Sequence, residues 1–144
     1  GAWRTRGDAE LALGRPEAAA AAFERAEALA QAIGHGGRHE ALAGRARVAS
    51  SQWDLATALA HVETLLARRA SDERWDGADE RSVLWICHQV LAQAGDARAA
   101  ALLADAQAEV QARAATISDA TLRASFLANV PHHRAIAAAW AAAA

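Results

Sequence analysis

The chain has 144 residues, a mass of 15.0 kDa and a formal net charge of −2 at pH 7. This charge balance gives no electrostatic reason to bind nucleic acid or an anionic membrane surface, so we expect neither as a partner. The sequence has no secretory signal and no apolar run long enough to span a bilayer, and its one cysteine, Cys87, has no second thiol with which to pair. We therefore expect the reducing cytoplasm as its location.

The composition predicts an all-α fold. Alanine is abundant, β-branched residues are few, Tyr is absent and only Pro16 and Pro131 interrupt the chain, so there is little material for a sheet. We predict a single domain over residues 1–144. The absence of Met, even at residue 1, indicates a fragment of a longer protein, and the all-arginine basic residues with the alanine content indicate a GC-rich bacterial genome.

The first predicted pair of helices covers residues 1–34. Gly14 supplies the left-handed residue that ends the first helix, and Pro16 lies at the start of the second. Gly7 costs roughly 1 kcal/mol relative to Ala inside a helix, which indicates a close approach by a neighbouring helix. In the second helix the large ring of Phe23 lies among small residues on one face. That face consists of Ala19, Phe23, Ala26 and Ala30.

Two further helical pairs are predicted, at residues 38–70 and 80–117. Asp54 is the expected N-cap of the fourth helix, and Gly95 ends the fifth. Short helices over residues 118–144 have no following repeat to cover, and we expect them to fold back as a cap.

The three pairs align on their turns. The first helices share equivalent positions at Trp3, Leu42 and Leu84, which gives periods of about 39 and 42 residues. The equivalent positions in the second helices are Ala19, Ala58 and Ala100. An internal repeat of helical hairpins predicts a stacked solenoid.

The pattern Trp3-x3-Gly7, Gly14 and Ala19-x3-Phe23-x2-Ala26 resembles the tetratricopeptide repeat. This resemblance implies an α-α superhelix of three helical hairpins with C-terminal capping helices. The long periods and the tail from Ile117 to Arg134 are similar to the C-terminal helical-repeat region of large bacterial signalling ATPases and of transcription activators of the maltose-regulator type.

The resemblance also implies that the first helix of each pair lines a concave face, where exposed residues bind a partner. Trp85 is the candidate anchor, and Arg4 and Arg47 are candidate readers of charge on a peptide or partner helix. For any one residue, a solvated face with charges placed for solubility is an equally good interpretation. The candidate partner-binding residues are Arg4, Asp8, Leu11, Glu40, Arg47, Ser51, Trp85, Gln89 and Gln93.

No motif for catalysis, a cofactor or a metal is found, so we expect no enzyme and no bound cofactor. His35 and His39 are one helical turn apart, but Gly34–Gly37 reads as a hinge and no third ligand has suitable spacing, which favours surface histidines. The same interpretation holds for His132-His133. Cys87 and His88 point about 100° apart on one helix and do not form a nucleophile–base pair.

The tryptophans divide into two groups. Trp3, Trp53 and Trp140 fit packing positions in the predicted helices. Trp75 lies in a polar linker, where it either pins the linker to the helices or is an exposed anchor, and we favour pinning.

Three functions stay open at the level of sequence. The first is a scaffold within a bacterial regulatory protein that binds a protein or peptide through its concave face; homodimerisation through the exposed N-terminal end around Trp3 is a variant. The second is a sensor domain for a small effector, which a deep apolar pocket near Trp85 and Cys87 would favour. The third is the helical part of an enzyme whose catalytic residues lie elsewhere.

Overall fold

The computed structural model describes residues 2–34, 37–71, 75 and 80–143, and within these ranges all regular secondary structure is helical. Residues 35 and 36 of the predicted hinge lie outside the described residues. The helices are α1 (Ala2–Ala12), α2 (Pro16–Ala32), α3 (Gly37–Ser51), α4 (Leu55–Ala70), α5 (Glu80–Gln93), α6 (Arg98–Ala115), α7 (Ala120–Asn129) and α8 (Pro131–Ala143). The all-α prediction is confirmed for this part of the chain, and the helix ends lie within about two residues of those expected.

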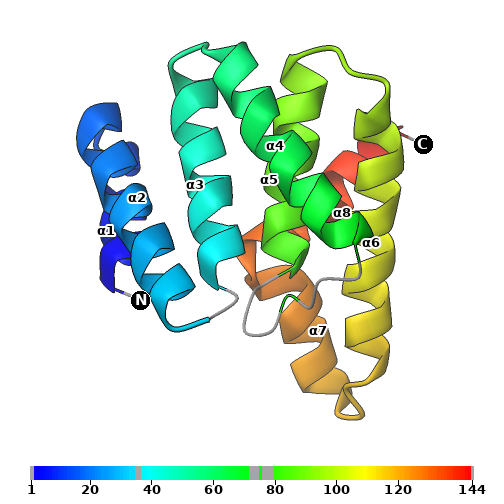
Figure 1. Cartoon of the computed structure of the whole chain (residues 1–144). Helices are drawn as coiled ribbons and strands as arrows, with labels where there is room; N and C mark the ends of the chain where they lie inside the picture. The colour runs from blue at the N-terminus through cyan, green and yellow to red at the C-terminus, as the bar shows by residue number, and fades with distance from the viewer. Residues whose placement is uncertain (1, 35–36, 72–74, 76–79, 144) are drawn as a thin grey trace.

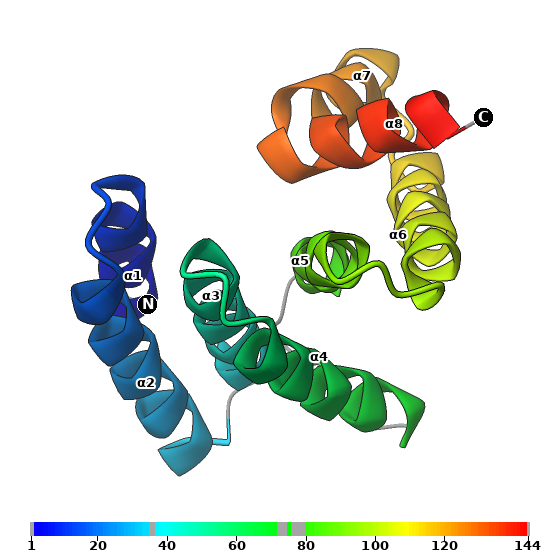
Figure 2. The same ribbon diagram turned by 90° about the horizontal axis from the view of Figure 1, so that it is seen from above.

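The first six helices form antiparallel pairs that lie side by side (Figure 1). Helix α3 packs against both helices of the first pair, and α5 packs against both helices of the second. Seen from above, α1, α3 and α5 lie on the inner side of a curved row, and α7 and α8 turn over its far end against α6 (Figure 2). The row therefore has a concave side lined by the first helix of each pair.

Two of the three turns within pairs end on a left-handed glycine, as predicted. Gly14 has φ of +72° and Gly95 has φ of +70°. In each turn the N–H of the following residue closes onto the carbonyl five residues back, at 2.9 Å for Arg15 to Glu10 and 2.9 Å for Asp96 to Leu91. This bond pattern is the Schellman motif.

The turn between α3 and α4 has the same bonds but not the same residue. The N–H of Asp54 reaches the Ala49 carbonyl at 2.9 Å, and the left-handed position is taken by Trp53, with φ of +58°. A non-glycine residue pays about 1–2 kcal/mol for this conformation. The prediction that Trp53 occupies a packing position is wrong: the residue is 75% exposed, because the turn position projects it into solvent.

The register of the third pair differs from the prediction by one residue. Ala19 and Ala58 are fully buried, but Ala100 is exposed and Ala99 takes the equivalent buried place. The first turns explain the difference. The N–H groups of Ala19 and Ala58 bond to carbonyls four residues back, whereas that of Ala99 bonds to Asp96, three residues back. This tighter first turn brings α6 into contact one residue earlier.

The core has two unequal parts. A large cluster of apolar side chains runs through α3, α4, α5 and α6 and reaches Ile136 on α8. A small cluster joins the first pair to α3 and is built around Phe23, whose ring lies between Gly7 and Gly44. A Cβ atom at Gly7 would lie 2.7 Å from the ring and one at Gly44 would lie closer still. The predicted close approach at Gly7 is confirmed.

Within the described residues, none of the helices combines the length and the apolar character needed to cross a membrane.

Candidate functional site

The concave side contains three adjoining hollows of about 260, 620 and 370 Å³. Arg47 and Ile86 line all three, so the hollows form one continuous depression, which we call the concave groove. The structure brings every candidate residue of the sequence analysis to this groove. They come from α1 (Arg4, Asp8, Leu11), α3 (Glu40, Arg47, Ser51) and α5 (Trp85, Gln89, Gln93).

Other lining residues were missed by the sequence analysis. Some lie on the same inner helices, one or three positions from a residue that the repeat alignment selected; others come from the start of α8, whose fold-back position the repeat does not specify. They are Gly44, Ser50, Ser82, Ile86 and Val90, with Pro131, His132 and Ala135 from the cap. Periodicity selects a helix face, but it does not give the width of the hollow.

Two ion pairs cross the groove wall between α1 and α3. Arg4 pairs with Glu40, and the Nη1 atom of Arg47 lies 2.8 Å from the Oδ1 atom of Asp8. Each guanidinium predicted to read a partner's charge thus has a carboxylate beside it in the protein. These four lining residues carry no net charge, and pairs this exposed add little stability singly.

Trp85 is held in a defined orientation at the largest hollow. Its indole stacks on the His88 ring with centroids 5.5 Å apart and planes inclined by 26°. The His88 Nδ1 atom lies 2.8 Å from the Ala99 carbonyl oxygen, and because a carbonyl only accepts, Nδ1 carries the proton. His88 is thus fixed to the start of α6 and supports the partly exposed indole from behind.

Amide and hydroxyl groups line the other end of the groove. The Ser50 hydroxyl donates to Oε1 of Gln93, and Nε2 of Gln93 reaches the Ser50 carbonyl at 3.4 Å. These bonds join α3 to α5. The Gln89 side chain, one turn before Gln93, is exposed and lines two of the three hollows.

The cap wall of the groove is fixed by His133, which is 2% exposed. Its Nδ1 atom donates to the Phe126 carbonyl at 2.8 Å, and its Nε2 atom accepts from Nε of Arg81 at 3.1 Å. The prediction of a plain surface residue is wrong for His133, because its ring is enclosed between Phe126 of α7 and Arg81 of α5. His132 lines the groove.

Two titratable side chains are buried in the core and do not line the groove. Cys87 is fully buried, and burial raises the pKa of its thiol to about 12, so the thiol stays protonated and unreactive at neutral pH. His39 is also fully buried, which contradicts its prediction as a surface residue. Burial, and then the positive charges of Arg38 and Arg68, lower the pKa of His39 to about 4, so its ring is neutral.

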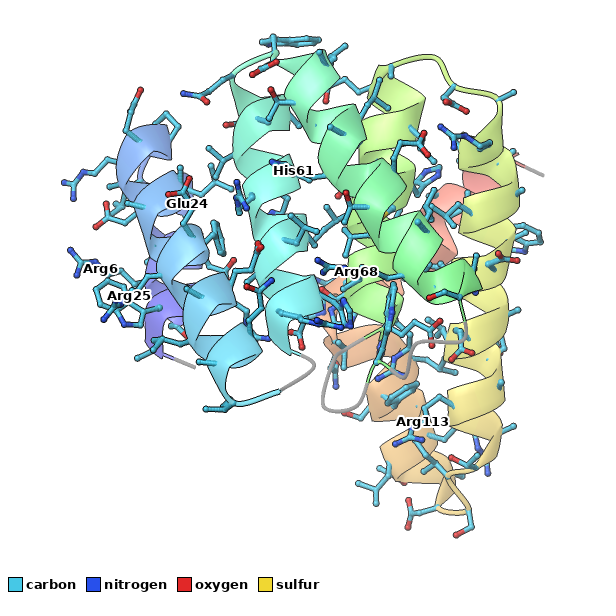
Figure 3. All side chains as sticks on the ribbon, in the orientation of Figure 1. Arg6, Glu24, Arg25, His61, Arg68 and Arg113 are labelled. Atoms are coloured by element: carbon cyan, nitrogen blue, oxygen red, sulfur yellow. The ribbon has the colours of Figure 1, made fainter. Side chains whose placement is uncertain are left out.

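His39 also explains the place of Trp75. The two rings are stacked, with centroids 4.9 Å apart and planes inclined by 25°, and Trp75 packs against the large core cluster. Arg68 extends from α4 toward α3 (Figure 3), and its Nη1 atom lies 3.4 Å from the His39 Nδ1 atom. The preferred prediction, that Trp75 pins its linker to the helices, is confirmed. His35, the other half of the candidate metal pair, lies outside the described residues.

The homodimer variant of the prediction concerns the N-terminal end of the row, around Trp3. Trp3 is 37% exposed and the Arg6 guanidinium lies 5.4 Å from its ring centroid. Arg6 and Arg25 project from the side of the first pair that faces away from α3 (Figure 3). Leu29 and Ile33 are exposed on α2.

Across the residues that the structure describes, no group of three or more His, Cys, Asp or Glu side chains is placed to hold a metal ion. Comparison of the chain with protein-family models, with curated proteins and with solved structures gives no match.

Proposed function

We propose that this chain is a tetratricopeptide-like helical-repeat scaffold that binds an extended peptide segment of a partner protein in its concave groove. We further propose that it serves a bacterial regulatory protein in the cytoplasm. One observation carries the proposal: nine residues chosen only by their position in the repeat line a single groove. If the repeat served packing alone, there would be no reason for the residues at its inner positions to remain accessible to a ligand.

The dimensions of the groove suit a short peptide. Its α5 wall runs from Ser82 to Gln93, a helical rise of about 16 Å. An extended chain advances about 3.3 Å per residue, so this wall spans about five residues of peptide. Serine hydroxyls and glutamine amides supply both donors and acceptors for a peptide backbone, and Trp85 and Ile86 supply apolar contact.

A small effector is the second candidate, because the hollow beside Trp85 has a volume within the range of small-molecule sites, roughly 300–1,000 Å³. The peptide is favoured over it for two reasons. Cys87 is buried in the core instead of lining this hollow, so the deep apolar pocket expected for a sensor is not formed there. The hollow also continues into its neighbours through Arg47 and Ile86.

Selection from a displayed peptide library tests the proposal. Peptides of about twelve residues would be selected on the wild-type chain, and their dissociation constants measured by fluorescence polarisation. Gln89→Arg places a bulky charge in the groove from an exposed position, and we expect it to weaken the selected peptides about tenfold or more.

Gln111→Arg is the matched control, since it makes the same change at an exposed position of α6 away from the groove. Helicity measured by circular dichroism should be equal in the wild type and both variants. A library that yields no binder, or binding that Gln89→Arg leaves unchanged, would contradict the proposal. Displacement of the peptide signal by a small metabolite would favour the sensor.

A further inference from the structure

The strained turn between α3 and α4 has no explanation in the fold. Its left-handed position is occupied by Trp53, whereas the two sister turns with the same hydrogen bonds use Gly14 and Gly95. The Trp53 side chain is 75% exposed, so packing does not compensate for the backbone strain. A residue that is both strained and exposed, where glycine serves equally well, indicates a role outside folding.

Trp53 follows closely after the residues of α3 that line one of the hollows of the concave groove. Ser50 and Ser51 line the hollow of about 370 Å³, and they precede Trp53 by only three and two residues. The N–H of Trp53 bonds to the Ser50 carbonyl at 3.1 Å, which ties the backbone of the turn to the end of α3. The exposed indole is therefore attached to the chain two residues after the groove wall.

The next residue supplies a negative charge. Asp54 is exposed and caps α4 by accepting a hydrogen bond from the Thr57 N–H at 3.2 Å. Its hydrogen bonds with Thr57 lower the pKa of the Asp54 carboxyl, so it stays ionised at neutral pH. Among the described residues Asp54 forms no ion pair; His61 is the other titratable group that influences it, and burial lowers the pKa of that ring, which keeps it neutral.

We propose that Trp53 and Asp54 form a rim anchor that binds an arginine or lysine side chain of the peptide occupying the groove. This inference rests on the proposed function and specifies the chemistry of the ligand. An indole face attracts a cation, and a carboxylate beside it pairs with the same cation. A purely apolar side chain at this place would strip water from the Asp54 carboxylate without replacing it, so a basic side chain is the better match.

Two substitutions test the anchor while preserving the turn. Trp53→Gly installs the residue of the sister turns, and Asp54→Asn keeps an N-capping side chain but removes its charge. Asp119→Asn is the matched control, because Asp119 caps α7 in the same way and does not line the groove. Peptides selected on the wild-type chain are expected to carry a basic residue toward one end.

The measurement is a double-substitution cycle on one selected peptide. Replacing its basic residue by glutamine should weaken binding to the wild type and to Asp119→Asn about tenfold, and should change binding to Trp53→Gly and Asp54→Asn by less than about twofold. Thermal unfolding should show Trp53→Gly to be at least as stable as the wild type, an outcome that a packing role for the indole does not allow.

The two proposals fail in different ways. Peptides that lose affinity on Gln89→Arg but bind Trp53→Gly and Asp54→Asn as they bind the wild type would overturn the rim anchor and leave the groove in place. Selected peptides without basic residues would have the same effect. Failure to select any peptide would overturn both, and marked destabilisation by Trp53→Gly would assign the indole to folding and overturn the anchor.

Discussion

The two joints between helical pairs differ in how much apolar contact accompanies their ion pairs. At the second joint, α3 and α4 meet α5 through a continuous apolar cluster that includes Val62, Leu65, Leu84 and Cys87, all fully buried. At the first joint, the small cluster around Phe23 is the apolar part, and ion pairs complete the contact. The pairs are Arg4–Glu40, Arg45–Glu27 and Arg47–Asp8.

Because of this difference, we expect the two joints to contribute differently to the stability of the molecule. An apolar joint gains free energy in proportion to buried area, so the second joint holds the body of the molecule together. The first joint relies on one ring fitted between two glycines and on exposed charges, and it positions α1, which forms one wall of the concave groove. We therefore expect the first pair to open locally before the body unfolds.

Leu84→Ala should give the largest effect. Leu84 is fully buried in the large cluster, and truncation of such a residue costs about 3–4 kcal/mol through lost burial and the cavity left behind. Chemical denaturation should show a lower midpoint, with loss of α1 and α2 accompanying loss of the body. Leu122→Ala, at an exposed position of α7, is the control. If Leu84→Ala lowered the stability of only a minor fraction of the helical signal, the second joint would not be the contact that holds the body of the molecule together.

Acidification should lower the free energy of unfolding of the body of the molecule, because His39 is buried as a neutral ring. The folded pKa of about 4 is below the ordinary value of 6.5, so the unfolded chain binds more protons between these values. The contribution is fully present above pH 6.5 and is lost as the pH falls toward 4, with a magnitude on the order of 3 kcal/mol. His39→Gln removes this titration. The difference in urea midpoint between the wild type and the variant should change across this pH range, and a constant difference would rule out the neutral buried ring.

Gly44→Ala should undock the first pair. In an open helix this change adds about 1 kcal/mol of stability, but here the new Cβ atom would overlap the Phe23 ring, and overpacking costs about 1–3 kcal/mol. We expect a net loss of about 1–2 kcal/mol, seen as faster amide hydrogen exchange in α1 and α2 with α5 unchanged. Adding Phe23→Leu should restore part of the loss. A stabilised single variant would mean that the ring does not fill this space.

The pairing of helices could be predicted from the sequence because its causes are local. Gly14, Gly95 and Asp54 specify turns and a cap through their own backbone and side-chain chemistry, and the structure has all three as expected. The choice of inner-face residues followed from the repeat, and all of them line the groove.

The errors have causes beyond local sequence. Ala100 is displaced by Ala99 because α6 begins with a tighter turn, a matter of one hydrogen bond. His133 is buried because α8 packs against both α5 and α7, and residues far apart in the chain decide that contact. Trp53 has a large apolar side chain of the kind that usually packs against other residues, but its left-handed turn position keeps that side chain in solvent. Neither a helix period nor a turn motif carries this information.

High salt should loosen the first joint more than the second. Ion pairs also cross the second joint, Arg69–Glu80, Arg69–Asp105 and Arg98–Glu63, but there they lie beside the large apolar cluster. At about 1 M salt the screening length falls to roughly 3 Å, and partly exposed ion pairs lose most of their attraction. We expect the opening free energy of α1 and α2 to fall by about 1 kcal/mol in total, because each pair contributes only a fraction of this. Hydrogen exchange in low and high sodium chloride measures it. Glu40→Gln should reduce the salt effect, and equal sensitivity at the centre of α5 would mean that the first joint does not depend on its ion pairs more than the second does.

Trp53→Gly should give the smallest change, with the opposite sign. The substitution relieves a left-handed strain of about 1–2 kcal/mol, but it also gives the unfolded chain more freedom, at a cost of up to about 1 kcal/mol. A net gain of about 0.5 kcal/mol is expected in thermal or urea unfolding, with both joints unaffected in hydrogen exchange. Trp53→Ala is the matched control, because it removes the indole and keeps the strain, so it should not stabilise. If both variants destabilise the chain equally, the indole packs in solution, and the contrast between Trp53 and its glycine counterparts at Gly14 and Gly95 would reflect folding and not ligand binding.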